Sequence, residues 1–140
     1  MVNPVSIENE PFAGKWSFNA KLSSMCTPEP ESWIKEISAG PEGLAVREQI
    51  VRLDGTEFVR RVRARFDGAD YPVEGALDVD TIAFTRTDRH AISGLGKKDG
   101  EISLTETLLA DPEQRTLTLI YNYLLGGLTV AHGVAVFQTA

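Results

Sequence analysis

Two Asp-Gly pairs, Asp54-Gly55 and Asp67-Gly68, constrain the fold of this chain more than any other feature. Each pair lies between runs that mix β-branched, aromatic and charged residues. Asp-Gly in that setting is a strong short-range signal of a β-hairpin with a type I′ turn. Residues 44–73 therefore predict a three-stranded antiparallel meander.

Counting outward from two-residue turns predicts which residues of the meander lie opposite one another. One face then holds three pairs of opposite charge, so we expect it to face solvent. The pairs are Arg52 with Glu57, Glu48 with Arg61 and Arg65 with Asp70, and Arg63 lies beside them.

The other face of the meander is mostly apolar, but Arg60 and Gln49 lie opposite each other in its middle. A cation on an apolar face is costly unless something pairs with it. Arg60 is therefore the first candidate for a ligand-binding residue. The alternative is an arginine whose head reaches solvent at the rim of a barrel. The other residues predicted on this inner face are Arg47, Val51, Leu53, Phe58, Val62, Ala64, Phe66, Tyr71 and Val73.

A further strand is predicted over residues 33–39, joined to the meander by a Gly-Pro-Glu-Gly turn. If that turn has four residues, Lys35 lies opposite Glu48 on the outer face. Glu36 then points inward opposite Arg47, which predicts an ion pair near an open end of the sheet.

Most of the remaining chain also predicts strands at hairpin spacing, and no helix of convincing length. About ten antiparallel strands result, and closing them into an up-and-down barrel removes the exposed sheet edges. We therefore predict an all-β fold, with residues 1–11 as an N-terminal extension and 12–140 as one barrel of about 8–10 strands. A barrel of this size encloses a ligand cavity rather than a solid core.

The later strands add polar groups to the predicted interior. Counting from the turn Asp99-Gly100 places Glu106 on an apolar face with Ile102, Leu104 and Leu108. A carboxylate is thus embedded among apolar residues.

The Gly126-Gly127 hairpin sets the predicted faces of the last two strands. The bulkier face, which pairs Tyr121 with His132 and Tyr123 with Val130, is predicted to be the inner one. The opposite face is unusually apolar for an outer surface, which predicts a contact between subunits of a homodimer. That face holds Ile120, Leu124, Ala131, Gly133, Ala135 and Phe137.

Composition excludes several classes of function. The net charge of −6 is spread without a basic patch, so nucleic acid is not an expected partner. No apolar run reaches the length of a signal peptide or a membrane span, so we expect a cytoplasmic protein that does not bind membranes. Cys26 is the only cysteine and His90 and His132 the only histidines, which predicts neither a disulfide nor a metal site. We expect no cofactor, although a haem held by the single axial ligand His132 stays open.

The segment Phe12-x-Gly14-x-Trp16 resembles the first strand of the calycin group, which comprises lipocalins and fatty-acid-binding proteins. The wider pattern of GKWSFNAKLS, FDGADYPVEG, DTIAFTR, KKDG and VAVFQ resembles a bacterial group of small lipocalin-like proteins. The resemblance implies a barrel closed below by Trp16, with a cavity for a small, largely apolar molecule. Fatty-acid-binding relatives hold a carboxylate through an Arg-x-Tyr in the last strand, whereas this chain has Ala135-Val136-Phe137 there.

Two classes of function remain open. The first is a binding barrel for a small hydrophobic or amphipathic molecule, since no nucleophile motif is present. The second is a cofactor-independent enzyme, such as a cyclase of the Diels-Alderase type or an isomerase of bacterial natural-product biosynthesis, because the predicted interior is more polar than inert binding needs.

In either case, Arg60 and His132 are expected to orient a carbonyl, enolate or carboxylate of the ligand. Under the enzyme hypothesis, a buried Glu106 with a raised pKa, or His132 held by Tyr121, acts as general acid or base. The alternative is that Arg60 and Glu106 only neutralise each other across the barrel. The remaining predicted ligand contacts are Gln49, Trp16, Phe58, Phe66, Tyr71, Phe84, Leu119 and Tyr123.

Overall fold

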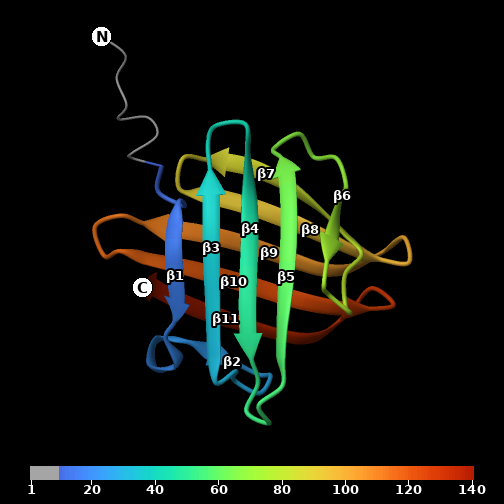
Figure 1. Ribbon diagram of the computed structural model, residues 1–140. Coiled ribbons are helices and arrows are strands. Elements are labelled where there is room, and N and C mark those ends of the chain that lie inside the picture. The colour runs from blue at the N-terminus through green and yellow to red at the C-terminus, as the bar shows by residue number, and fades with distance from the viewer. Residues whose placement is uncertain (1–9) are drawn as a thin grey trace.

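The computed structural model describes residues 10–140, and within them ten antiparallel strands close into an up-and-down barrel (Figure 1). Strands that follow one another in the chain pair with one another, and β1 pairs with β11 to close the ring. The short strand β2 pairs with β11 as an eleventh strand of the sheet. The all-β barrel predicted from the sequence is thus confirmed.

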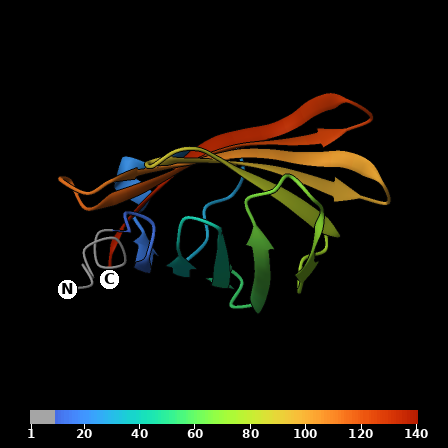
Figure 2. The ribbon, with the colours of Figure 1, turned by 90° about the horizontal axis from the view of Figure 1, so that it is seen from above.

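The strands are β1 (Gly14–Phe18), β2 (Ser24–Met25), β3 (Ser32–Ala39), β4 (Gly43–Val51), β5 (Glu57–Arg65), β6 (Tyr71–Glu74), β7 (Thr81–Asp88), β8 (Ala91–Lys98), β9 (Glu101–Asp111), β10 (Thr116–Leu125) and β11 (Leu128–Thr139). A 3-10 helix, η1 (Ala20–Leu22), follows β1. Figure 2 shows that β3–β6 form one wall of the barrel and that β8–β11 lie across from them. None of the described residues belongs to a helix long and apolar enough to span a membrane.

One end of the barrel, here called the closed end, is filled by side chains. Phe12 is fully buried, and its carbonyl accepts a 3.0 Å hydrogen bond from Nε1 of Trp16. The guanidinium of Arg86 binds both carboxylate oxygens of Glu10 at 2.7 and 3.0 Å, and it lies against the rings of Phe12 and Phe66. A bidentate pair held between aromatic rings is a strong and geometrically specific contact. It fixes the segment before β1 across this end.

The register between β4 and β5 differs by one residue from the prediction. Ile50 lies opposite Phe58 and Val51 opposite Glu57. The reason is a three-residue loop in place of a two-residue turn, because the N–H of Arg52 donates to the carbonyl of Thr56 at 2.8 Å. Gly55 takes the left-handed conformation that such a loop needs, with φ of 86°.

This one-residue difference reverses the faces of β3 and β4, because the side chains of a strand alternate. The predicted pairing of Lys35 with Glu48 is correct, but both side chains point into the barrel instead of outward. The predicted ion pair of Glu36 with Arg47 is present at 3.8 Å, but the predicted inward direction is wrong, since both side chains lie on the outer surface. Gln49 likewise lies outside the cavity, where it donates to Glu57.

The second Asp-Gly turn has the predicted register, with Val62 opposite Val73. The faces of β5 are therefore as predicted. Arg61 and Arg63 are exposed, while Phe58 lines the interior.

A bulge between Tyr123 and Leu124 changes the register of β10 with β11. Leu125 lies opposite Leu128 as a two-residue turn requires, but Tyr121 lies opposite Gly133 rather than His132. Consequently the inner residues predicted for β10 are correct and those predicted for β11 are wrong.

The apolar outer face of the last two strands, from which a homodimer was predicted, does not contain all the predicted residues. Ala135 and Phe137 are fully buried inside the barrel, because the bulge turns them inward. Ile120 and Leu124 stay on the outside of β10, where Ile120 is 38% exposed.

The face predicted for β9 is correct at Leu104, Glu106 and Leu108, all of which line the interior. Ile102 is exposed instead, because a bulge shifts the pairing at the start of the strand, between Gly96 and Lys97.

Gly94 allows a close approach of β8 to the residues around it. A Cβ at this position would lie 2.8 Å from Cγ of Glu106 and 3.1 Å from the ring of Phe84. We predict that Gly94→Ala lowers the free energy of unfolding by about 1–3 kcal/mol through overpacking.

The control is Gly40→Ala, where a Cβ would meet nothing within 4 Å. We expect this change to be neutral or slightly stabilising. Urea denaturation of both variants tests the prediction, and equal stability of the two would contradict it.

Candidate functional site

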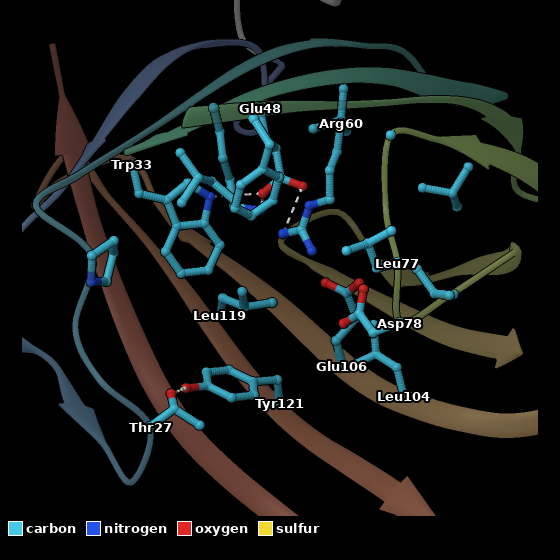
Figure 3. A pocket seen from close by; sticks show the side chains of 18 of the residues that line it. Thr27, Trp33, Glu48, Arg60, Leu77, Asp78, Leu104, Glu106, Leu119 and Tyr121 are labelled. Atoms are coloured by element: carbon cyan, nitrogen blue, oxygen red, sulfur yellow. Dashed lines mark hydrogen bonds and ion pairs between the residues drawn. The ribbon is translucent and has the colours of Figure 1, made fainter. Parts of the chain in front are cut away.

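A cavity of about 1030 Å³ occupies the barrel between its two walls (Figure 3). Its opening, here called the mouth, lies opposite the closed end and is bordered by residues of the loops 26–31, 52–56 and 75–80. Both walls contribute apolar side chains, so the interior suits an apolar molecule. These side chains include Ile50, Phe58, Val62, Ile82, Phe84, Leu104 and Leu119.

Four polar side chains from three neighbouring strands form a cluster in this cavity, here called the Glu48 network. One carboxylate oxygen of Glu48 accepts hydrogen bonds from Nε1 of Trp33 at 2.9 Å and from Nζ of Lys35 at 2.5 Å. The other oxygen lies 3.1 Å from the guanidinium of Arg60. Glu48 thus joins β3, β4 and β5 inside the barrel.

The Glu48 network is buried, with side-chain exposures of 6% for Lys35, 13% for Glu48 and 15% for Arg60. Burial by itself would raise the pKa of Glu48, but the charges of Arg60 and Lys35 and the hydrogen bonds outweigh it and lower the pKa to about 2. Lys35 also lies 5.1 Å from the ring of Trp33. Glu48 therefore stays ionised and holds both cations.

Arg60 keeps an unused donor. Its Nε is buried and has no hydrogen-bond partner, and it is the one buried side-chain nitrogen or oxygen among residues 10–140 of which this is true. The guanidinium lies beside Tyr123, whose pKa is raised chiefly by burial. A buried donor without an acceptor is costly, so an oxygen atom of a bound molecule would stabilise it.

Glu106 faces the cavity from β9, and Figure 3 shows its carboxyl group beside that of Asp78 and below Arg60. No hydrogen bond or ion pair holds Glu106 within the described part of the chain. Burial raises its pKa, and the charges of Glu48 and Asp78 raise it further, while Lys35 and Arg60 oppose the change. A carboxyl group in this setting can hold a proton and donate it.

Tyr121 lies opposite Glu106 on the neighbouring strand β10. Its hydroxyl is 3.2 Å from Oγ1 of Thr27, and burial raises its pKa. A Cβ on Gly133 would come within 2.5 Å of the Tyr121 hydroxyl, so only glycine leaves room for this ring.

Several residues predicted for the site do line the cavity, although their roles stay predictions. They are Arg60, Glu106, Tyr121, Phe58, Phe84, Leu119 and Tyr123.

Four other predicted ligand contacts lie elsewhere. Trp16 is buried at the closed end rather than beside the cavity, and Phe66 packs against Arg86 there. Tyr71 donates from its hydroxyl to Asp67 at 2.7 Å, away from the cavity. Gln49 is outside because of the register of β4.

The prediction that His132 faces the cavity is wrong. Its side chain is exposed on the outer wall, so it can neither act on a molecule in the cavity nor bind a haem there. Its backbone is fixed by Cys26, whose Sγ donates to the His132 carbonyl and accepts from the His132 N–H. Among the described residues no three His, Cys, Asp or Glu side chains are placed to hold a metal ion.

Among the cavity residues that sequence reasoning missed are Trp33, Lys35, Glu48 and Asp78. A signal for the first three was present, because Leu44, Val46 and Ile50 alternate as the inner face of a strand should. That alternation contradicts the register counted from a two-residue turn. Asp78 comes from a loop, whose position no periodicity predicts.

No family model matches this chain, and no curated protein matches it significantly. Among solved structures it is similar to Rv2717c from M. tuberculosis, with a TM-score of 0.55 and 15% sequence identity. That match covers 100% of this chain and 99% of that chain. At this identity the similarity shows a shared barrel fold.

We predict that Glu48→Gln lowers the free energy of unfolding at neutral pH by about 3–5 kcal/mol, because it leaves two buried cations without a charged partner. Glu36→Gln is the matched control, since Glu36 pairs with Arg47 on the exposed side of the same two strands. A surface pair of this kind contributes about 0–1 kcal/mol. Urea denaturation of both variants is the measurement, and similar losses would contradict the central role of Glu48.

The raised pKa of Glu106 predicts a pH dependence of stability. The folded protein holds a proton that the unfolded chain has already lost, so stability falls as pH rises from the ordinary carboxyl range through the folded pKa. Glu106→Gln should remove this loss. The variant should therefore gain stability relative to the parent between about pH 4 and about pH 8. Denaturation curves at both pH values test this, and a constant difference would show that Glu106 titrates normally.

Proposed function

We propose that this barrel binds a small, largely apolar molecule in its cavity. The observation that carries the proposal is a cavity of about 1030 Å³ with mostly apolar walls and a buried donor, Nε of Arg60, that has no partner. Small-molecule sites commonly combine apolar walls with a few polar groups that orient the ligand. The apolar body would occupy the space between the walls, and an oxygen atom of the ligand would accept from Arg60.

The lipocalin-like sequence pattern supports the same function, since barrels of the calycin group enclose such cavities. The mode of fatty-acid-binding relatives is not part of the proposal, because the Arg-x-Tyr of the last strand is absent. Phe137, at the end of the corresponding stretch, is fully buried between Phe18 and Trp33. The arginine buried in the wall of this cavity is Arg60 of β5.

A second candidate is a cofactor-independent cyclase or isomerase acting in the same cavity. The observation that favours it is Glu106, a buried carboxyl with a raised pKa that faces the cavity beside Asp78. A protonated Glu106 could donate to a carbonyl oxygen of the substrate, and Arg60 could stabilise the developing enolate. Tyr121 is the second candidate for proton transfer, and His132 has no part in this scheme.

We predict that Arg60→Met weakens the binding of prodan, a neutral naphthalene ketone, by roughly 1–3 kcal/mol. The ketone oxygen would lose its donor while the apolar contacts remain. Prodan emission measures the binding directly, because it shifts when the dye leaves water.

The matched control is Arg61→Met, which removes an exposed arginine from the adjacent position of β5. We expect parent-like affinity from it, and circular dichroism checks the fold of both variants. Absence of saturable prodan binding to the parent would contradict the proposed function. Equal affinities of the two variants would contradict the role of Arg60.

A further inference from the structure

Acidic side chains outnumber basic ones around the cavity. Of the described residues that line it, three are basic and six are acidic. The basic ones are Lys35, Arg52 and Arg60, and the acidic ones are Glu29, Glu48, Asp54, Glu57, Asp78 and Glu106. The field inside such a cavity attracts cations and repels anions.

The two buried cations are already engaged. Lys35 and Arg60 share the single carboxylate of Glu48, at 2.5 and 3.1 Å. A ligand carboxylate that approached them would have to compete with Glu48, which is held by three donors. The cavity therefore offers an anion little net attraction.

The opposite holds for two carboxyl groups. Asp78 and Glu106 both line the cavity, the charge of Asp78 acts on Glu106, and neither forms an ion pair within residues 10–140. The charges of Glu48 and Asp78 raise the pKa of Glu106, against the opposing charges of Lys35 and Arg60. A further cation beside Glu106 and Asp78 would favour the ionised form of Glu106.

Acidic side chains also outnumber basic ones at the mouth of the cavity. Glu29, Asp54 and Glu57 border it, while the guanidinium of Arg52 lies over the ring of Phe58 at 4.9 Å. Leu53 and Leu77 also border the mouth and are 72% and 88% exposed. An entering molecule thus meets negative charge together with apolar surface.

We infer that the molecule bound in this cavity is an apolar amine, whose protonated nitrogen lies between Asp78 and Glu106 while its apolar body fills the space toward Phe84 and Leu119. The inference rests on the proposed function and specifies its ligand class. An oxygen on the same molecule would in addition satisfy Nε of Arg60. The nitrogen donates to both carboxylates, and charge-assisted hydrogen bonds of this kind are stronger than neutral ones.

Three probes with the same eight-carbon chain and different head groups test this inference: octylamine, 1-octanol and octanoate. Binding of each to the full chain is measured by isothermal titration calorimetry at neutral pH. We expect octylamine to bind at least about tenfold more tightly than octanol, the worth of one charge-assisted hydrogen bond. Octanoate should bind more weakly than octanol.

The double variant Asp78→Asn, Glu106→Gln should bind octylamine and octanol with similar affinity. If the double variant still binds octanol, its cavity is intact. The control variant Glu36→Gln, changed on the outer surface, should keep the parent's preference for octylamine over octanol. Octanoate binding as tight as that of octylamine, no detectable octylamine binding, or an unchanged preference in the double variant would each overturn the inference. Prodan or octanol binding in any of those cases would leave the proposed function standing.

Discussion

The carboxylate of Glu48 is the interaction on which the interior of this barrel depends. It accepts from Trp33 and Lys35 on β3 and binds Arg60 on β5, so one side chain connects three adjacent strands. Each of these polar groups would be costly inside the barrel without the others. The contact with Glu48 also holds the guanidinium of Arg60 in the wall of the cavity.

The Glu48 network also determines what the cavity can recognise. Because Glu48 pairs with both buried cations, the polar groups left for a ligand include Nε of Arg60 and the carboxyl groups of Asp78 and Glu106. The amine proposed for this cavity would reverse the charge preference of the fatty-acid-binding barrels that the sequence resembles, which hold a carboxylate. The polarity of the site thus follows from how its charges pair rather than from the fold.

The inward-facing residues were predicted correctly in strands where the alternation of apolar residues and the register counted from the turn agreed. The inner residues of β5 and β10, and those of β9 from Leu104 onward, are as predicted, which is why Arg60, Glu106 and Tyr121 were found. The errors came from β3, β4 and β11, whose faces were inferred by counting across a turn. One extra loop residue before Glu57 reversed the faces of β3 and β4, and one bulge beside Tyr123 reversed the face of β11. As a result Glu48 lies inside the barrel and His132 outside, the opposite of the prediction.

The sequence by itself determined the all-β class, the positions of the turns and the faces of strands with clear alternation, because these depend on near neighbours along the chain. Tertiary structure decided the register at two hairpins. Loops of two and three residues are both common in hairpins, so local turn preference does not decide between them. Burying Leu44, Val46 and Ile50 instead of Arg47 and Gln49 stabilises the fold by several kcal/mol, at about 25 cal/mol per Å² of apolar surface. Packing across the barrel therefore chose the loop. It also brought Asp78 from a distant loop beside Glu106, a neighbourhood that no spacing in the sequence encodes.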